Sequence, residues 1–209
     1  MEYLGSLTRI GLLVAGLLVA GSSAEAASTT RYVQDSAGSR VIVEGTSTLH
    51  GWRAEGALVG ALVLTDSDLS GLWSISGDVR EVAATARVDI PVTSLTSGND
   101  GLDQNMYRAL QAGTHPAIRY RLTAAQIAGA PDSDRLTVEA TGMLTVAGVE
   151  RPISLVVALE RLPNDRFQVT GQTTLRMTDF NIKPPKAMLG MIRSGDEVQV
   201  SWSWFLVRE

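Results

Sequence analysis

The sequence contains no cysteine, only two histidines, and aromatic residues at 5%. Without cysteine the chain can form no disulfide, thiolate nucleophile, iron–sulfur cluster or cysteine-ligated zinc site. A histidine-rich metal centre is hard to build from His50 and His115 alone. Lysine and arginine do not cluster and the formal net charge is −4, whereas binding to nucleic-acid phosphates needs a basic face. We therefore expect no metal, no cofactor and no nucleic-acid partner.

The first residues of the chain have the pattern of a secretory signal peptide. Arg9 precedes an apolar run from Ile10 to Ala20, which is typical of a signal-peptide core and too short to span a bilayer. Small residues follow, and Ala24-Glu25-Ala26 matches the A-x-A cleavage pattern. We therefore expect cleavage before Ala27 and a periplasmic or secreted protein, without an integral membrane span, that forms one domain over 27–209. An uncleaved anchor or a buried helix is the alternative.

Apolar and polar residues alternate over most of the remaining chain, which is typical of strands with one buried face. This alternation predicts strands over 40–48, 52–64, 81–90, 118–124, 135–146, 153–159, 166–176 and 197–206. Short turns such as Ala147-Gly148 join several of them, so neighbouring strands should be antiparallel. We expect an all-β fold, an extended eight-stranded antiparallel up-and-down barrel, because about eight long strands with one apolar face close in this way. A two-sheet sandwich is the other common arrangement.

Two segments interrupt the alternation. One short helix is predicted over about 100–113, with Asp100 or Asp103 as its cap and Gly113 at its end, because apolar residues recur there at helical spacing: Leu102, Met106, Ala109 and Leu110. The segment over about 181–196 contains Lys183-Pro184-Pro185 followed by apolar residues. We expect it to be a capping loop at a barrel end, either a lid or ordinary packing.

The sequence shows no recognisable catalytic motif. His50 lies at an expected bend between strands, and a catalytic role would require a nucleophile and an orienting carboxylate that the sequence does not reveal. His115 precedes a proline and is expected in a turn. Asp66 and Asp68 have calcium-like spacing, but the loop lacks the glycine and final glutamate of an EF-hand, so a solvated turn is expected. We expect no enzyme activity; an enzyme acting on a bound lipid near His50 is the alternative.

The inward face of the expected barrel carries many small residues: Ala84, Ala86, Ala124, Ala140, Gly142 and Gly171. A barrel of this size holds either packed side chains or one small ligand, and burial of one isoprene unit can contribute up to about 4 kcal/mol. From the inward alternation we predict these ligand-facing residues: Tyr120, Leu122, Val138, Leu144, Leu155, Val157, Phe167, Val169, Val200, Trp202, Trp204 and Met106. An interior that is filled by side chains stays open as the alternative.

Four stretches, in chain order, resemble signatures of the YceI family. They are Thr46-Ser-Thr-Leu-His-Gly-Trp52, then Met106-Tyr-Arg-Ala-Leu110 leading to His115-Pro-Ala-Ile-Arg-Tyr120, then Gly142-Met-Leu-Thr-Val-Ala-Gly-Val-Glu-Arg-Pro-Ile153, and finally Met177-Thr-Asp-Phe-Asn-Ile-Lys-Pro-Pro-Lys-Ala-Met-Leu-Gly190 followed by Arg193-Ser-Gly-Asp-Glu-Val198. The resemblance covers nearly all of the chain after the leader. It implies a lipocalin-like eight-stranded barrel with a long internal channel for polyisoprenoid or fatty-acyl chains, often in the periplasm and sometimes in dimers.

Our leading hypothesis is an exported carrier or sequestering protein that binds a long apolar lipid inside the barrel; a homodimer stays open. The alternative is a filled-barrel structural or protein-interaction module without a lipid ligand. Its partner surface would include the outward apolar positions Val59, Ala61 and Val63. An outer-membrane barrel would need apolar residues outside and aromatic girdles, which the charged outer positions and scarce aromatics disfavour.

Overall fold

A computed structural model describes residues 27–75, 79–128, 134–187 and 191–209, and the expected leader over 1–26 lies outside the described residues. The described strands are β1 (Thr29–Gln34), β2 (Arg40–Ser47), β3 (Gly51–Ala57), β4 (Val59–Thr65), β5 (Val79–Glu81), β6 (Ala84–Pro91), β7 (Ala117–Ala128), β8 (Arg135–Val146), β9 (Val149–Leu162), β10 (Arg166–Arg176), β11 (Lys186–Ala187) and β12 (Ile192–Arg208). The helices are α1 (Asp100–Ala109) and the short 3₁₀ turns η1 (Ser70–Ser74), η2 (Val92–Ser94) and η3 (Met177–Phe180). None of these helices has the length and apolar character to cross a bilayer.

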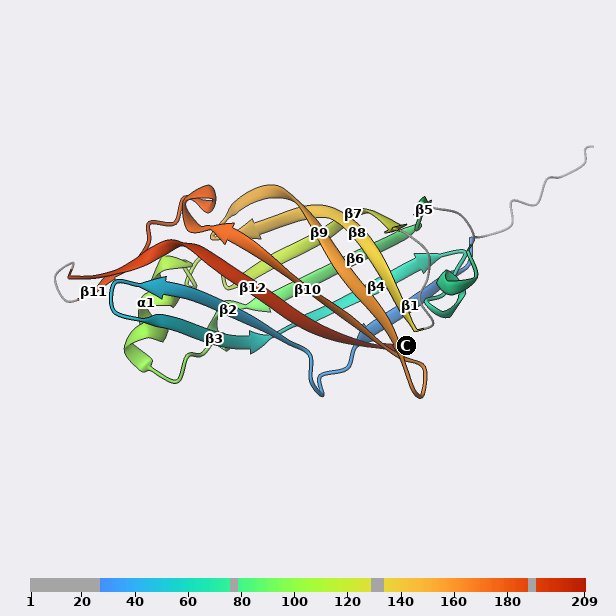
Figure 1. Ribbon diagram of the computed structural model, residues 1–209, viewed down its shortest axis with the longest axis horizontal. Coiled ribbons are helices and arrows are strands. Elements are labelled where there is room, and N and C mark those ends of the chain that lie inside the picture. The colour runs from blue at the N-terminus through green and yellow to red at the C-terminus, as the bar shows by residue number, and fades with distance from the viewer. Residues whose placement is uncertain (1–26, 76–78, 129–133, 188–190) are drawn as a thin grey trace, which may run out of the picture.

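Eight of the strands close into an antiparallel barrel, as predicted. Their order around the wall is β1, β4, β6, β7, β8, β9, β10 and β12, and β1 pairs with β12 to complete the circle (Figure 1). β12 runs for 17 residues and also pairs with β2. The β2–β3 hairpin therefore extends the wall beyond β1 and β4, at the end of the molecule where α1 lies (Figure 1).

Two interruptions in the first part of the wall were not expected. The predicted strand over 52–64 is divided into β3 and β4 at Leu58, which is buried. β1, which the alternation did not predict, and β2 pair with successive parts of β12, so they follow one another along the same neighbour. Residues 35–39 leave the wall between them, where the Ser39 hydroxyl donates a hydrogen bond to the Asp35 carbonyl oxygen.

The apolar face of each strand points into the barrel. In β8, Leu136 and Ala140 are buried whereas Thr137 and Glu139 are exposed. β7 departs from the prediction because its register against β8 shifts between Leu122 and Ala124. Such a bulge adds one residue and reverses the alternation beyond it. The prediction that Ala124 faces inward is therefore wrong: Ala124 is exposed, and Ala125 faces the interior.

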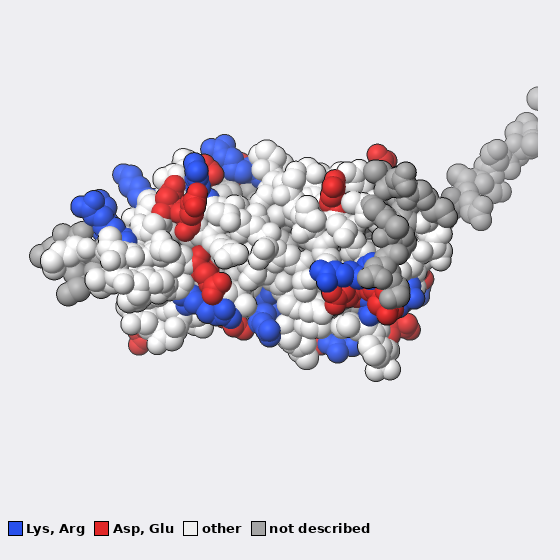
Figure 2. Space-filling view, viewed as in Figure 1, with Lys and Arg blue, Asp and Glu red and all other residues white. Residues whose placement is uncertain are grey.

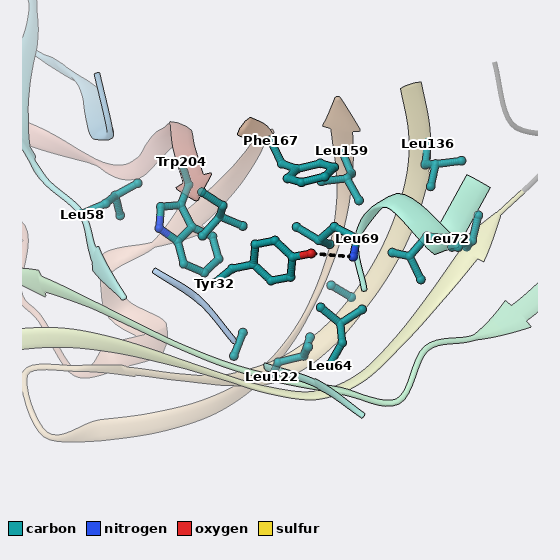
Figure 3. Close-up of a cluster of buried hydrophobic side chains, with 14 of the residues drawn as sticks. Tyr32, Leu58, Leu64, Leu69, Leu72, Leu122, Leu136, Leu159, Phe167 and Trp204 are labelled. Carbon is teal, nitrogen blue, oxygen red and sulfur yellow. Dashed lines mark hydrogen bonds between the residues drawn. The ribbon is translucent and has the colours of Figure 1, made fainter. Parts of the chain in front are cut away.

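One end of the barrel is closed by side chains packed beneath η1. This η1 plug consists of Tyr32, Leu64, Leu69, Leu72, Leu136, Leu159 and Phe167 (Figure 3). The Tyr32 hydroxyl accepts a hydrogen bond from the Leu69 amide at 3.0 Å, and its ring meets Phe167 edge-on with centroids 5.7 Å apart. On the outside, Arg161 lies over the Trp73 ring and donates to the Ser70 carbonyl oxygen, which fastens η1 to the wall.

The opposite end holds α1, whose position was predicted but whose cap was not. The helix is capped by Asn99, whose side chain accepts a hydrogen bond from the Leu102 amide at 3.0 Å. Asp103, one of the two predicted caps, instead accepts hydrogen bonds from the amide and hydroxyl of Ser97 and is buried. Asp100, the other predicted cap, is the first residue of the helix.

The segment predicted as a capping loop over 181–196 has two parts. Ile182, together with Phe180 from η3, is buried against Val146 and Ala147 and closes part of this end. Farther along, β11 pairs with the start of β12, and this ribbon projects beyond the barrel (Figure 1). The capping role therefore belongs to the first residues of the segment, and the last ones are strand.

Phe167 and Val169 face inward from β10, but only Phe167 is enclosed on all sides, at 1% exposure. We predict that Phe167→Ala lowers the free energy of unfolding by about 3–5 kcal/mol, because it leaves a cavity in the η1 plug. Val169 borders open space, so the control Val169→Ala should lower the free energy of unfolding by less than about 2 kcal/mol. Urea unfolding of both variants measures the difference, and equal losses would contradict a plug that is packed more tightly than the rest of the interior.

Candidate functional site

Between the η1 plug and α1 the barrel encloses a cavity of about 310 Å³, which we call the channel. This volume lies at the lower end of the range of small-molecule sites, which is about 300–1,000 Å³. The channel wall is formed by inward residues of the barrel strands together with α1, η1 and η3. The side chains of the described residues therefore leave the interior partly empty, in contrast to a filled scaffold.

Eleven of the twelve residues predicted to face a ligand line the channel. They are Tyr120, Leu122, Val138, Leu144, Leu155, Val157, Val169, Val200, Trp202, Trp204 and Met106, the last of which comes from α1. Phe167 does not line it, because this side chain is enclosed by its neighbours in the η1 plug. Alternation along a strand identifies the inward face, but it gives no information on the position along the barrel axis.

Several channel residues lie outside the alternating runs and were missed. Leu95, which follows η2, is buried and lines the channel. Phe180 and Ile182 enter the wall from η3 and the residues after it. An isolated apolar residue in a connection gives no periodic signal, so only the three-dimensional arrangement identifies these positions.

The polar side chains of the channel gather at one end. Apart from the aromatic residues, the polar lining residues are Asn105 of α1, Thr173 and Arg176 of β10, and Ser194 of β12. Arg176 is also the one exposed residue in the lining, whereas the residues under η1 are buried. We call the end formed by Asn105, Arg176, Pro185 and Ser194 the mouth. The channel is thus apolar along its length, closed at η1 and polar at the mouth.

Three aromatic rings lie against the wall over glycines of neighbouring strands. Trp202 covers its cross-strand partner Gly171, Trp52 covers its partner Gly45, and Tyr120 covers Gly142. A Cβ atom at any of these glycines would overlap the ring above it, at Gly142 within 2.5 Å of the Tyr120 ring. Because glycine has no Cβ atom, the large rings can lie flat against the wall, which keeps their volume out of the centre of the channel.

Two buried polar atoms of the channel wall have no hydrogen-bond partner within the described residues: the Tyr120 hydroxyl and the Trp204 Nε1. Burial raises the pKa of Tyr120 to about 12, because the phenolate would lose its hydration in apolar surroundings. Tyr120 is therefore a neutral donor at physiological pH. An unpartnered buried donor is costly, and an oxygen atom of a bound molecule would relieve that cost.

The polar residues that the sequence singled out lie outside the channel. His50 is exposed in the β2–β3 turn, with Nδ1 2.6 Å from the Gly51 carbonyl oxygen. His115 lies in the connection before β7, and its ring packs over Gly148. Asp66 accepts a hydrogen bond from the Ser28 amide, and Asp68 accepts one from the Gly71 amide. Both carboxylates thus stabilise the local turns.

Comparisons with known proteins agree with the barrel fold. The model of the family described as YceI-like domain matches residues 32–204. No protein with a curated description matches the sequence. The fold is similar to that of a polyisoprenoid-binding domain from Saccharophagus degradans implicated in plant cell wall breakdown, with 15% identity, a TM-score of 0.62, and coverage of 85% of this chain and 98% of that one. It is also similar to that of Burkholderia cenocepacia BcnA, with 19% identity, a TM-score of 0.59, and coverage of 82% and 98%.

The pairing of Trp202 with Gly171 can be tested by a double-mutant cycle. We predict that Gly171→Ala lowers the free energy of unfolding by about 1–3 kcal/mol, because the new methyl group forces the Trp202 ring off the wall. In a Trp202→Leu background the same change should cost much less, since nothing occupies the space over residue 171. Urea unfolding of the four proteins provides the comparison. The same cost in both backgrounds would show that the ring does not depend on the glycine.

Proposed function

The chain belongs to the family of YceI-like domains, and we propose that its channel binds a single long apolar lipid of the polyisoprenoid or fatty-acyl class. The observation that carries the proposal is the channel itself: a cavity of about 310 Å³ that is apolar along its length and closed at one end. The likeness to a polyisoprenoid-binding domain adds to it.

The chemistry of the wall favours a chain over a compact polar ligand. Each buried methylene contributes roughly 0.8 kcal/mol, so an isoprene unit can contribute up to about 4 kcal/mol before the cost of ordering the chain. Affinity then needs no charged contact inside the barrel. The lining residues include no aspartate, glutamate or histidine, which also favours an apolar ligand.

The polarity of the two ends predicts how the lipid is oriented. The apolar end of the lipid would meet the η1 plug, where Leu69 and Leu72 form the floor of the channel. The polar end would remain at the mouth, within reach of Asn105 and Arg176. A ligand oxygen along the chain, such as an ester or carbonyl oxygen, would be a suitable acceptor for the Tyr120 hydroxyl.

We further propose that the protein is an exported carrier or sequestering protein and not an enzyme. The leader pattern ending at Ala24-Glu25-Ala26 supports export to the periplasm or beyond. The wall contains hydroxyl groups but no histidine or carboxylate that could act as a general base beside them, which supports binding without chemistry.

We predict that a long-chain lipid co-purifies with the protein and is identified by mass spectrometry of an organic extract. Ala140→Phe should reduce the lipid-to-protein ratio several-fold, because Ala140 is buried and lines the channel. The matched control is Thr141→Phe, which adds the same ring to the outer face of β8 and should leave the ratio unchanged.

Thermal unfolding of both variants verifies that they are folded. An empty wild-type channel, or an equal loss of lipid in the two variants, would contradict the proposed function.

A further inference from the structure

The β2–β3 turn lies beside the residues that begin β12, next to the mouth, and each of the two segments exposes a large apolar side chain. The Thr48 amide in the β2–β3 turn donates to the Arg193 carbonyl oxygen at 3.0 Å, and its hydroxyl donates to the Met191 carbonyl oxygen at 3.3 Å. Leu49 is 67% exposed and Met191 71%, the highest values among the large apolar residues of the described chain. Exposed apolar groups that gather in one place mark a contact surface.

The same place concentrates positive charge in a protein whose formal net charge is −4. Lys183 and Lys186 are the only lysines of the sequence, and both are exposed. Arg193 is exposed as well, and its backbone lies opposite Lys186 where β11 and β12 pair. Neither lysine forms an ion pair within the described part of the chain. Figure 2 shows basic side chains at the end of the molecule where β11 lies.

The neighbouring carboxylates do not neutralise this charge through direct pairing with the lysines. Asp196 accepts hydrogen bonds from the amide and hydroxyl of Thr178, which lower its pKa, and Glu197 pairs with Arg176. We call the surface formed by Leu49, Lys183, Lys186, Met191 and Arg193 the mouth tip. It combines exposed apolar side chains with uncompensated lysines at the end of the channel that is polar.

We propose that the mouth tip docks onto a lipid bilayer that contains acidic headgroups. Basic residues are attracted to the negative surface of such a bilayer, and apolar side chains can insert among the headgroups. Lysine is suited to this role because its stem can lie along the apolar region while its ammonium group stays at the surface. The five residues of the mouth tip are far fewer than the roughly 20–30 residues that each partner contributes to a stable protein complex. A bilayer needs no matching shape, so a surface of this size suffices.

The position of the mouth tip links docking to lipid exchange, and this part of the inference rests on the proposed function. Pro185 and Ser194 line the channel and are joined by a hydrogen bond of 3.0 Å from the Ser194 amide to the Pro185 carbonyl oxygen. Along the chain, Pro185 directly precedes Lys186 and Ser194 directly follows Arg193, the two residues that lie opposite each other in the β11–β12 pairing. Docking through the mouth tip would bring the mouth to the bilayer surface. A lipid could then pass between bilayer and channel with little exposure to water.

Flotation with vesicles tests the proposal on the full chain. We expect binding to vesicles of phosphatidylcholine mixed with phosphatidylglycerol, and weak binding to phosphatidylcholine alone. Lys183→Gln/Lys186→Gln and Leu49→Ser/Met191→Ser should each lower the partition coefficient at least about tenfold. The matched controls lie on the outer face of the barrel strands β7, β8 and β9. Arg121→Gln/Arg135→Gln removes two positive charges, and Val156→Ser removes an apolar residue that is 63% exposed. These controls should bind like the wild type.

Wild-type protein that fails to float with acidic vesicles, or controls that lose as much binding as the mouth-tip variants, would overturn the proposal. A change in oligomeric state of the mouth-tip variants, measured by size-exclusion chromatography, would assign the surface to a second copy and would also overturn it. Lipid in the channel is measured separately by mass spectrometry. An occupied channel without vesicle binding refutes docking alone, and vesicle binding with an empty channel refutes the lipid-binding function alone.

Discussion

The volume inside a closed barrel is fixed by its backbone, because strand number and stagger set the diameter before any side chain is placed. Here eight strands close through the pairing of β1 with β12. Side chains fill that volume under η1, where Phe167 and Tyr32 pack edge to face. Along the rest of the axis, small residues such as Ala86 and Ala140 leave it unfilled. The channel thus results from where large residues are placed.

The two ends of this volume differ in ways that give the molecule a direction. The η1 end is closed by hydrogen-bonded and ring-stacked side chains, including Arg161 over Trp73. The other end carries polar lining residues, the partial cap made by Phe180 and Ile182, and the projecting β11–β12 ribbon. A lipid chain in such a channel has one preferred orientation, and the polar end of the channel lies next to the mouth tip that we propose as a docking surface.

The alternation of apolar residues was sufficient to predict most strand positions and inward faces, because burial on one face of a strand has a period of two. The length of the strands and the short turns between them favoured a barrel over a sandwich. It could not reveal the bulge at Thr123, which reverses the face of Ala124, since a bulge changes pairing and not composition. It also could not separate Phe167 from Val169, which share a face but differ in position along the axis. Leu95 enters the site from a connection, and it carries no periodic signal. The resemblance to the YceI family supplied the expectation of a channel that the physical reasoning left open.

The most direct test of an apolar channel is calorimetric titration of the lipid-free protein with a series of isoprenoid or fatty-acyl chains of increasing length. Burial of apolar surface gives a negative change in heat capacity on binding. We predict that this change becomes more negative with each added unit until the chain reaches the η1 plug, and then stays constant. A heat-capacity change that is near zero, or that is the same for short and long chains, would contradict the burial of the lipid inside the barrel.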